Sequence, residues 1–142
     1  MLDGKLRLKE SSKLARTAKD VPTIVFTTRE GGDALKALGV DVITVVPDVH
    51  GRPDILAVLH ELALRGVTRL LVEGGATVHN AFLERGTAYR LEIFRSPTVL
   101  GAKGHGTVDA LSTLEAGARP RFVHLCSRKL GVDVLESFAV RA

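Results

Sequence analysis

The sequence predicts an α/β fold in which βαβ units build a parallel sheet and an antiparallel hairpin closes the chain at its C-terminus. Short apolar runs alternate with helical patterns over residues 23–85, and this alternation is typical of right-handed βαβ units. Two later runs are joined through a glycine, as in a hairpin. The 142 residues suffice for one domain, and they contain no internal repeat or low-complexity tract.

The parallel part is expected to contain three strands and three helices. Pro22 precedes the first β-branched run, and Pro47 closes the second. Gly39, Gly66 and Gly86 follow the three helical patterns and are typical helix stops. The expected strands are residues 23–27, 42–46 and 69–72, and the expected helices are residues 33–38, 53–65 and 77–85.

The pattern changes after the last of these helices. Residues 89–95 alternate apolar and polar side chains, which predicts a half-exposed strand. A loop with three glycines is expected at residues 101–106. Residues 122–127 and 134–140 are predicted to form the hairpin, with its turn at Gly131.

The start of the chain gives weaker signals. Residues 6–19 are polar, basic and poorly periodic, so residues 1–20 are interpreted as a connecting arm of a single domain over residues 1–142. The net charge of +4 is spread along the chain without interleaved aromatic residues, so no nucleic-acid partner is expected. No apolar run approaches the roughly 20 residues of a membrane helix, so no membrane partner is expected either.

Cysteine and histidine usage narrows the chemistry further. The one cysteine, Cys126, excludes an internal disulfide, and a reducing, cytoplasmic location is expected. Cys126 is predicted to face inward from its strand as a small core residue. No metal site and no Ser-His-Asp set is expected. His60 and His79 are interpreted as exposed helix positions, although His79 could approach a ligand. None of the five histidines shows metal-ligand spacing: His50, His60, His79, His105 and His124.

The most informative segment is residues 70–79, where an apolar run ends in Glu73, Gly74 and Gly75 and a helical pattern follows at once. Glycines allow a ligand to approach the backbone closely. The first N–H groups of a helix lack partners within it, and the helix dipole favours an anion there. The segment therefore predicts a phosphate cradle with a carboxylate at its edge. The alternative interpretation is a simple tight turn, with Glu73 stabilised by the dipole.

Three segments resemble the reductase domain of the riboflavin-pathway deaminase–reductase family, which has a dihydrofolate-reductase-like fold. They read PTIVFTT at residues 22–28, LLVEGGAT at residues 70–77, and LEIFRSPTVLG at residues 91–101. Phe82 and Gly86 follow the second segment as they do in the family. The resemblance extends over nearly the whole chain.

The resemblance implies NADPH-dependent reduction of 5-amino-6-(5-phosphoribosylamino)uracil to its ribitylamino form, by hydride transfer to the sugar C1. It also implies a homodimer. Thr27 and Thr28 would lie beside the 2′-phosphate of the cofactor, and Glu73 would face the pyrimidine substrate. Arg29 could pair with the same phosphate or be solvated. The cofactor phosphates would be held by Gly74, Gly75, Ala76, Thr77 and Val78. No catalytic residue is singled out, because the hydride chemistry belongs to the cofactor.

Two departures from the family pattern affect these expectations. Tyr89 and Arg90 stand where the family has an acidic pair. The family domain also begins with a further strand, helix and strand, and Leu2 and Asp3 correspond to the end of the second of these strands. The chain is therefore expected to be the C-terminal portion of a reductase domain, with low or no activity alone. Two alternatives remain: a non-catalytic dinucleotide-binding or dimerisation module, and a reductase of a pterin-like substrate.

Overall fold

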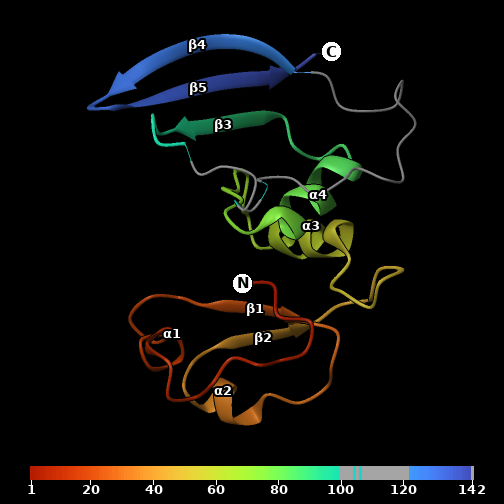
Figure 1. Cartoon of the computed structure of the whole chain (residues 1–142). Coiled ribbons are helices and arrows are strands. Elements are labelled where there is room, and N and C mark those ends of the chain that lie inside the picture. Colours follow the sequence, from red (N-terminus) through yellow and green to blue (C-terminus); the bar gives the residue numbers. More distant parts are fainter. Residues whose placement is uncertain (100–103, 105, 107–121, 142) are drawn as a thin grey trace. The chain divides into compact units, whose positions relative to one another are not determined.

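The computed structural model describes residues 1–99, 104, 106 and 122–141 (Figure 1). The chain divides into two compact units, Met1–Leu70 and Leu71–Ala142. The first unit contains α1 (Lys13–Arg16), β1 (Ile24–Thr27), α2 (Asp33–Ala37), β2 (Asp41–Thr44) and α3 (Ile55–Leu64). The second contains α4 (Ala76–Glu84), β3 (Arg90–Arg95), β4 (Phe122–Leu130) and β5 (Asp133–Val140).

The first unit is built on a parallel pair of strands. β1 and β2 pair in register from Ile24 opposite Asp41 to Thr27 opposite Thr44. Leu2 adds a parallel bridge to Phe26 on the other edge of β1. The strand–helix–strand order of β1, α2 and β2 confirms the predicted βαβ arrangement.

Side chains on both faces of β1 enter hydrophobic clusters. Val25 is fully buried in a cluster that includes Ala15, Leu35 and Val40. Phe26, the next residue, points to the opposite face, as the strand period of two requires. It packs in a second cluster with Val45 and Val58 of α3. The sheet of the first unit is therefore covered on both faces.

Helix α1 was not expected, because residues 6–19 show no helical periodicity. It is a single turn whose N-cap, Ser12, accepts a hydrogen bond from the backbone N–H of Ala15 at 3.2 Å. Ala15 and Ala18 are buried in the first cluster. A four-residue helix is too short to display an apolar repeat, so burial of small side chains leaves little trace in the sequence pattern.

The third parallel strand predicted at residues 69–72 is not formed, and residues 68–75 contain neither helix nor strand. Leu71 is 77% exposed. A strand requires a neighbouring ladder for its backbone N–H and C=O groups, and no described strand pairs with this segment. The prediction was wrong because an apolar run supplies the side chains of a buried strand but not its partner.

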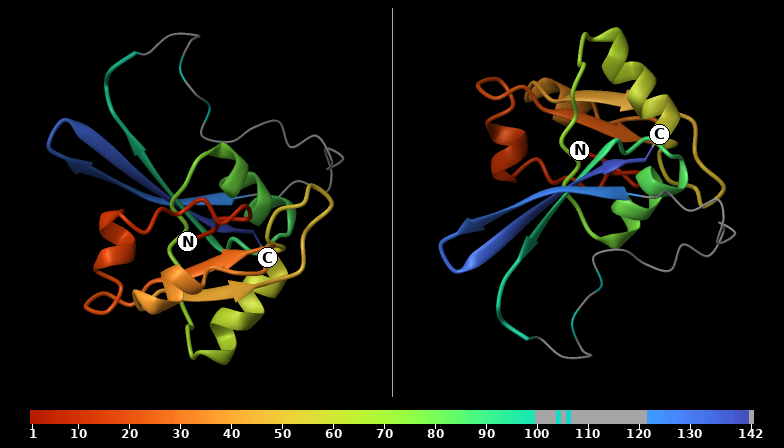
Figure 2. Two further views of the ribbon diagram at one scale, coloured as in Figure 1. Left: turned by 90° about the horizontal axis from the view of Figure 1, so that it is seen from below. Right: turned by 90° about the horizontal axis from the view of Figure 1, so that it is seen from above.

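The second unit joins α4 to an antiparallel sheet in the order β3-β5-β4 (Figures 1 and 2). Gly131, with φ of 63°, begins the two-residue turn between β4 and β5, and a glycine with positive φ is favoured at this position. The predicted hairpin is confirmed, with both strands reaching closer to the turn than expected. The glycine-rich loop expected at 101–106 lies outside the described residues apart from 104 and 106.

The prediction that Cys126 faces the core was wrong, because its side chain is exposed. The ladder between β4 and β5 changes register between His124 and Cys126. Residues 123–130 of β4 are nevertheless exposed on both sides of this irregularity. Since β4 is the edge strand of the sheet, an alternating pattern does not predict that either of its faces is buried.

Within the described residues, no helix is long and apolar enough to cross a membrane.

Candidate functional site

The N-terminus of α4 lies where the sequence predicts a phosphate cradle. Gly75 is the N-cap, with φ of −84° and ψ of 174°, and no side chain caps the helix there. Helix α3 differs, since the Asp54 side chain accepts a hydrogen bond from the N–H of Ala57 at 3.1 Å. The start of α4 thus lacks the oxygen acceptor that a capping side chain supplies to helix N–H groups.

The two glycines before α4 have different surroundings. A Cβ placed on Gly74 would lie 3.1 Å from the Cβ of Val78, so close packing on the first turn of the helix accounts for a glycine there. A Cβ on Gly75 would have no heavy atom within 4 Å, and the φ of Gly75 suits any residue. The fold of the unit therefore gives no reason for a glycine at position 75.

The predicted site residues around Gly75 fall into exposed and partly buried sets. Glu73 and Thr77 are exposed, whereas Ala76 and Val78 are half-buried. Phe82, one turn further along α4, is buried. This segment therefore exposes backbone and polar side chains at the helix start and buries the helix through its later turns. An uncapped helix start that faces solvent can bind an anion through backbone N–H groups and the dipole.

The predicted cofactor residues of the first unit lie at the carboxyl end of β1. Thr27 is fully buried, and its hydroxyl donates to the carbonyl of Gly4 at 3.3 Å and accepts from the N–H of Arg29 at 3.2 Å. The Thr28 hydroxyl lies 3.0 Å from the same carbonyl. The Arg29 side chain is exposed. Thr27 therefore shapes the strand end, while Thr28 and Arg29 form its more accessible surface.

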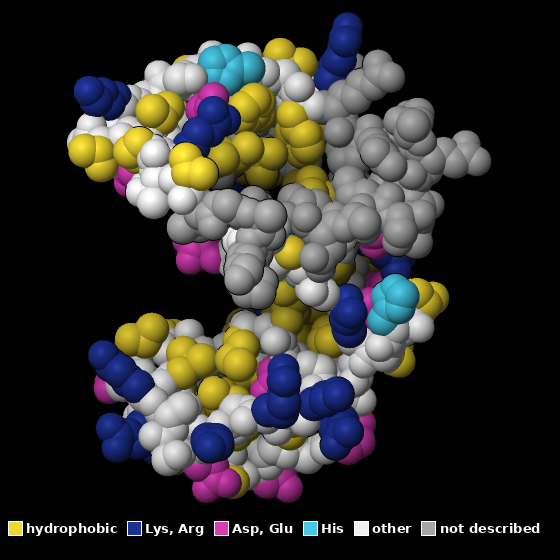
Figure 3. Space-filling view, in the orientation of Figure 1, with side chains coloured by type: hydrophobic (Ala, Val, Ile, Leu, Met, Phe, Trp, Pro, Cys, Tyr) yellow, Lys and Arg dark blue, Asp and Glu magenta, His cyan; other side chains and the backbone are white. Residues whose placement is uncertain are grey.

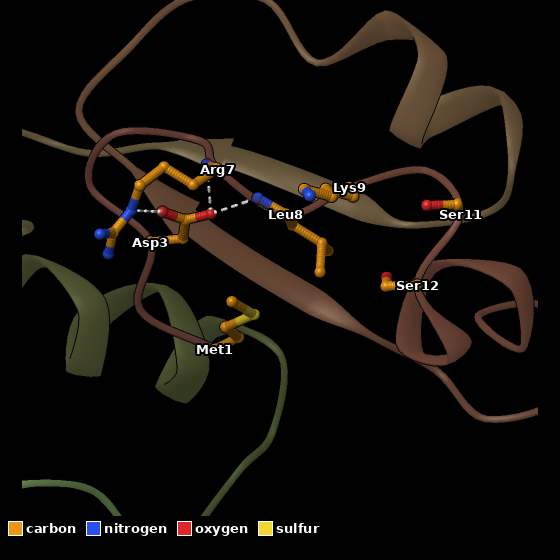
Figure 4. A pocket seen from close by; sticks show the side chains of 7 residues that line it. All are labelled: Met1, Asp3, Arg7, Leu8, Lys9, Ser11 and Ser12. Carbon is orange, nitrogen blue, oxygen red and sulfur yellow. Dashed lines mark hydrogen bonds and ion pairs between the residues drawn. The ribbon is translucent and has the colours of Figure 1, made fainter.

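The N-terminal segment, interpreted from its sequence as a connecting arm, lines a shallow pocket of about 400 Å³ that no sequence pattern predicts (Figure 4). Asp3 is 2% exposed at this pocket. Its Oδ2 accepts hydrogen bonds from the N–H groups of Arg7 and Leu8 at 2.6 and 2.8 Å, and Oδ1 lies 3.5 Å from Nε of Arg7. The lining residues are Met1, Asp3, Arg7, Leu8, Lys9, Ser11 and Ser12.

The lining of this pocket carries groups of both charges. Arg7 and Lys9 supply two cations, and Ser11 and Ser12 supply hydroxyls. Two backbone N–H groups and one guanidinium already engage the Asp3 carboxylate. Lys and Arg side chains also gather on the face of the first unit that Figure 3 shows. An Asp followed by Gly is a typical turn signal, and it was the available clue that Asp3 orders this segment.

The structure distributes the predicted site residues over both units. Thr27, Thr28 and Arg29 belong to the first unit, and Glu73 and residues 74–78 belong to the second. His60 is exposed as predicted, whereas His79 is half-buried on α4. Among the described residues, no three His, Cys, Asp or Glu side chains are grouped as they would be around a metal ion.

Comparison with known proteins identifies the family. The sequence model of the RibD C-terminal domain matches residues 1–135. The chain belongs to this family. The match confirms the resemblance that the segments at residues 22–28, 70–77 and 91–101 indicate.

Three bacterial proteins are among the curated relatives that the chain matches. The chain is 33% identical over 105 residues to the riboflavin biosynthesis protein RibD of Bacillus amyloliquefaciens, covering 71% of the chain and 27% of the relative. It is 34% identical over 137 residues to RibD of Aquifex aeolicus, covering 95% of the chain and 35% of that relative. It is 32% identical over 94 residues to the 2,5-diamino-6-ribosylamino-4(3H)-pyrimidinone 5′-phosphate reductase of the same organism, covering 63% and 41%. The chain thus matches less than half the length of these relatives.

Solved structures show the same fold. Acinetobacter baumannii RibD aligns with a TM-score of 0.81 at 22% identity, over 98% of this chain and 36% of that chain. A pyrimidine reductase-like protein from Corynebacterium diphtheriae aligns with a TM-score of 0.77 at 17% identity, over 99% and 59%. The riboflavin biosynthesis reductase Rib7 of Saccharomyces cerevisiae aligns with a TM-score of 0.67 at 20% identity, over 98% and 63%. The predicted dihydrofolate-reductase-like α/β fold is thereby confirmed.

Proposed function

We propose that this chain carries the cofactor-binding part of an NADPH-dependent reductase that converts 5-amino-6-(5-phosphoribosylamino)uracil to its ribitylamino form. Membership of the RibD C-terminal domain family supports a riboflavin-pathway reductase. The Aquifex aeolicus relative is named as the reductase of a pyrimidinone 5′-phosphate, and this name supports a pyrimidine as the substrate of this chain.

Gly75 is the observation that carries the proposal. It begins α4 without a side-chain cap, and a Cβ at this position would have open space around it. The unit itself leaves room for a side chain here, so we attribute the glycine to a ligand that approaches the backbone. A phosphate fits this position, because it can accept hydrogen bonds from the N–H groups at the helix start.

NADPH, when bound, supplies the hydride that reduces the sugar C1. The chain's own residues bind the cofactor and the substrate and orient them toward each other. Gly74, Gly75, Ala76, Thr77 and Val78 would hold the phosphates at the start of α4, and Glu73 would face the pyrimidine. Thr28 and Arg29 would lie beside the 2′-phosphate. The buried Thr27 hydroxyl positions Arg29 through the hydrogen bond from its N–H.

The test combines binding and turnover. Titration calorimetry with NADPH measures whether the chain holds the cofactor. NADPH oxidation is then followed with the phosphoribosylamino-pyrimidine and, separately, with a dihydropterin. The proposal expects NADPH binding and pyrimidine-dependent oxidation. Binding without turnover of either substrate would favour a non-catalytic module, and turnover of the pterin alone would favour a pterin-type reductase.

A further inference from the structure

The loop between β2 and α3, residues 47–53, is held by its own backbone. Pro47 and Pro53 form an antiparallel bridge at its base. The N–H of Asp48 donates to the carbonyl of Arg52 at 2.7 Å, and the N–H of Gly51 donates to the carbonyl of Asp48 at 3.0 Å. These contacts fix the path of the 47–53 loop without help from a core side chain at its tip.

The Asp48 side chain adds to this order. Its Oδ1 accepts hydrogen bonds from the N–H groups of His50 and Arg52 at 2.8 and 2.9 Å. The tip nevertheless faces solvent: Val49 is 91% exposed, and His50, Gly51 and Arg52 are exposed as well. An ordered loop that presents exposed side chains on a rigid scaffold is a common location for binding residues.

The 47–53 loop follows the carboxyl end of β2, which is the neighbour of the carboxyl end of β1 (Figure 1). The Thr28 hydroxyl, which hydrogen bonds to Gly4 at 3.0 Å, lies 3.5 Å from the carbonyl of Gly51. Gly4 also meets the loop, since a Cβ on it would lie 2.9 Å from Cδ of Pro53. Arg29 follows Thr28 in the sequence, and Arg52 follows Gly51. The contact between Thr28 and Gly51 therefore joins the two backbone segments that carry these arginines.

Both guanidinium groups are available to a ligand. Arg29 and Arg52 are exposed, and the ion pairs found in the described part of the chain include neither of them. The carboxylate of Asp48, in the same loop, is engaged by backbone N–H groups. Ligands of parallel α/β sheets bind beyond the carboxyl ends of the strands, which is where this pair lies.

We propose that Arg52 forms, with Arg29 and Thr28, a binding site for a phosphate monoester, and that Arg52 thereby determines the preference for NADPH over NADH. Guanidinium groups match a phosphate through paired N–H donors. The 2′-phosphate is the group that distinguishes the two cofactors. This inference rests on the proposed function, because it takes NADPH as the ligand.

The test measures dissociation constants of NADPH and NADH by titration calorimetry for the wild type, Arg52→Ala, Arg52→Lys and Arg16→Ala. Arg16 is an exposed arginine on α1, near the amino end of β1 (Figures 1 and 2), so Arg16→Ala removes the same charge away from the proposed site. For Arg52→Ala we expect NADPH to bind roughly ten- to hundredfold more weakly, as expected for loss of charged hydrogen bonds. NADH affinity is expected to stay unchanged, and Arg52→Lys is expected to lose less than Arg52→Ala.

The outcomes separate this inference from the proposed function. If the wild type binds NADPH and Arg52→Ala retains the same ratio of NADPH to NADH affinity, the role of Arg52 is overturned while the proposed function stands. An equal loss in Arg16→Ala would also overturn it, because general charge would then explain the effect. A wild type that binds neither dinucleotide would overturn the proposed function and this inference together. Melting temperatures of all variants show whether each is folded.

Discussion

At the scale of single residues, Asp3 orders the start of the first unit. Its carboxylate is buried and accepts two backbone hydrogen bonds from the turn that follows. That turn contains Leu6, which has a φ of 51°, a conformation that non-glycine residues seldom adopt. The hydrogen bonds to Asp3 compensate for this conformation and also fix the backbone at Arg7.

We therefore expect Asp3→Ala to lower the free energy of unfolding by about 1–3 kcal/mol, the usual range for leaving buried partners unsatisfied. Urea denaturation measures the change. Asp33→Ala is the matched control, since the Asp33 side chain is 91% exposed and pairs only with Lys36 on the surface, and its effect should stay within about 0.5 kcal/mol. Equal effects of the two substitutions would contradict the structural role of Asp3.

Gly74 and Gly75 allow a second comparison at this scale. Gly75→Val should weaken NADPH binding at least tenfold (roughly the loss of one charged hydrogen bond) while lowering the free energy of unfolding by no more than about 1 kcal/mol, the N-cap preference. Gly74→Val should cost more stability, because its Cβ would press on Val78. Calorimetric binding and urea denaturation provide both quantities. Unchanged NADPH affinity in a folded Gly75→Val protein would remove the support for the cradle.

At the scale of elements, the sequence predicts what local patterns encode and misses what pairing decides. Helices α2, α3 and α4 and strands β1 and β2 follow from their apolar spacing and stop signals, and each lies within a few residues of its predicted bounds. The strand expected at residues 69–72 fails because its ladder depends on a distant partner. Cys126 faces solvent because it lies on an edge strand whose residues 123–130 are all exposed, and no local pattern reveals this.

The candidate site also has one part that local sequence patterns predict and one part that they do not. The exposed helix start at Gly75 could be predicted, since a glycine pair between an apolar run and a helical pattern is a local signal. Two other features depend on contacts between segments more than 20 residues apart. They are the hydrogen bond from the buried Thr27 to Gly4 and the approach of the 47–53 loop to Thr28. Such contacts leave no periodic trace in a single sequence.

The sheet of the second unit contains a charged cluster that makes its stability depend on pH. Glu92 on β3 accepts a hydrogen bond from the buried Ser137 hydroxyl on β5 and pairs with Arg90. The Ser137 hydrogen bond, followed by Arg90 and Arg128, holds the pKa of Glu92 below its ordinary value of 4.5. The ionised form is therefore favoured in the folded state.

The direction of the pH dependence of stability follows from the lowered pKa of Glu92. A carboxylate whose folded pKa is below its unfolded pKa contributes stability above the unfolded value, and this contribution is lost as the pH falls through the folded value. We expect the free energy of unfolding to decrease as the pH falls below about 4.5 and this decrease to be smaller in Glu92→Gln. Glu30→Gln, in an exposed loop, is the control. Identical pH profiles for the wild type and Glu92→Gln, measured by urea unfolding, would contradict this account.

At the scale of the whole molecule, we expect a homodimer, as the family resemblance implies. No described strand pairs with the outer edge of β4, and Val123 and Leu125 on this strand are about half exposed, at 48% and 51%. Unpaired edges with apolar side chains favour association. Light scattering coupled to size-exclusion chromatography should give twice the 15.2 kDa mass of one chain. A stable monomer at micromolar concentration would count against the dimer.

The central claim is that the start of α4 holds the phosphates of NADPH, and amide NMR tests it most directly. At 15.2 kDa the chain suits a ¹⁵N-resolved titration in which each backbone N–H reports its own environment. The account predicts that NADPH shifts the amide signals of residues 74–78 together with those of Thr28 and Arg29. It also predicts that Gly75→Val suppresses the shifts at residues 74–78. Shifts confined to other residues, or no shifts at saturating NADPH, would contradict the account.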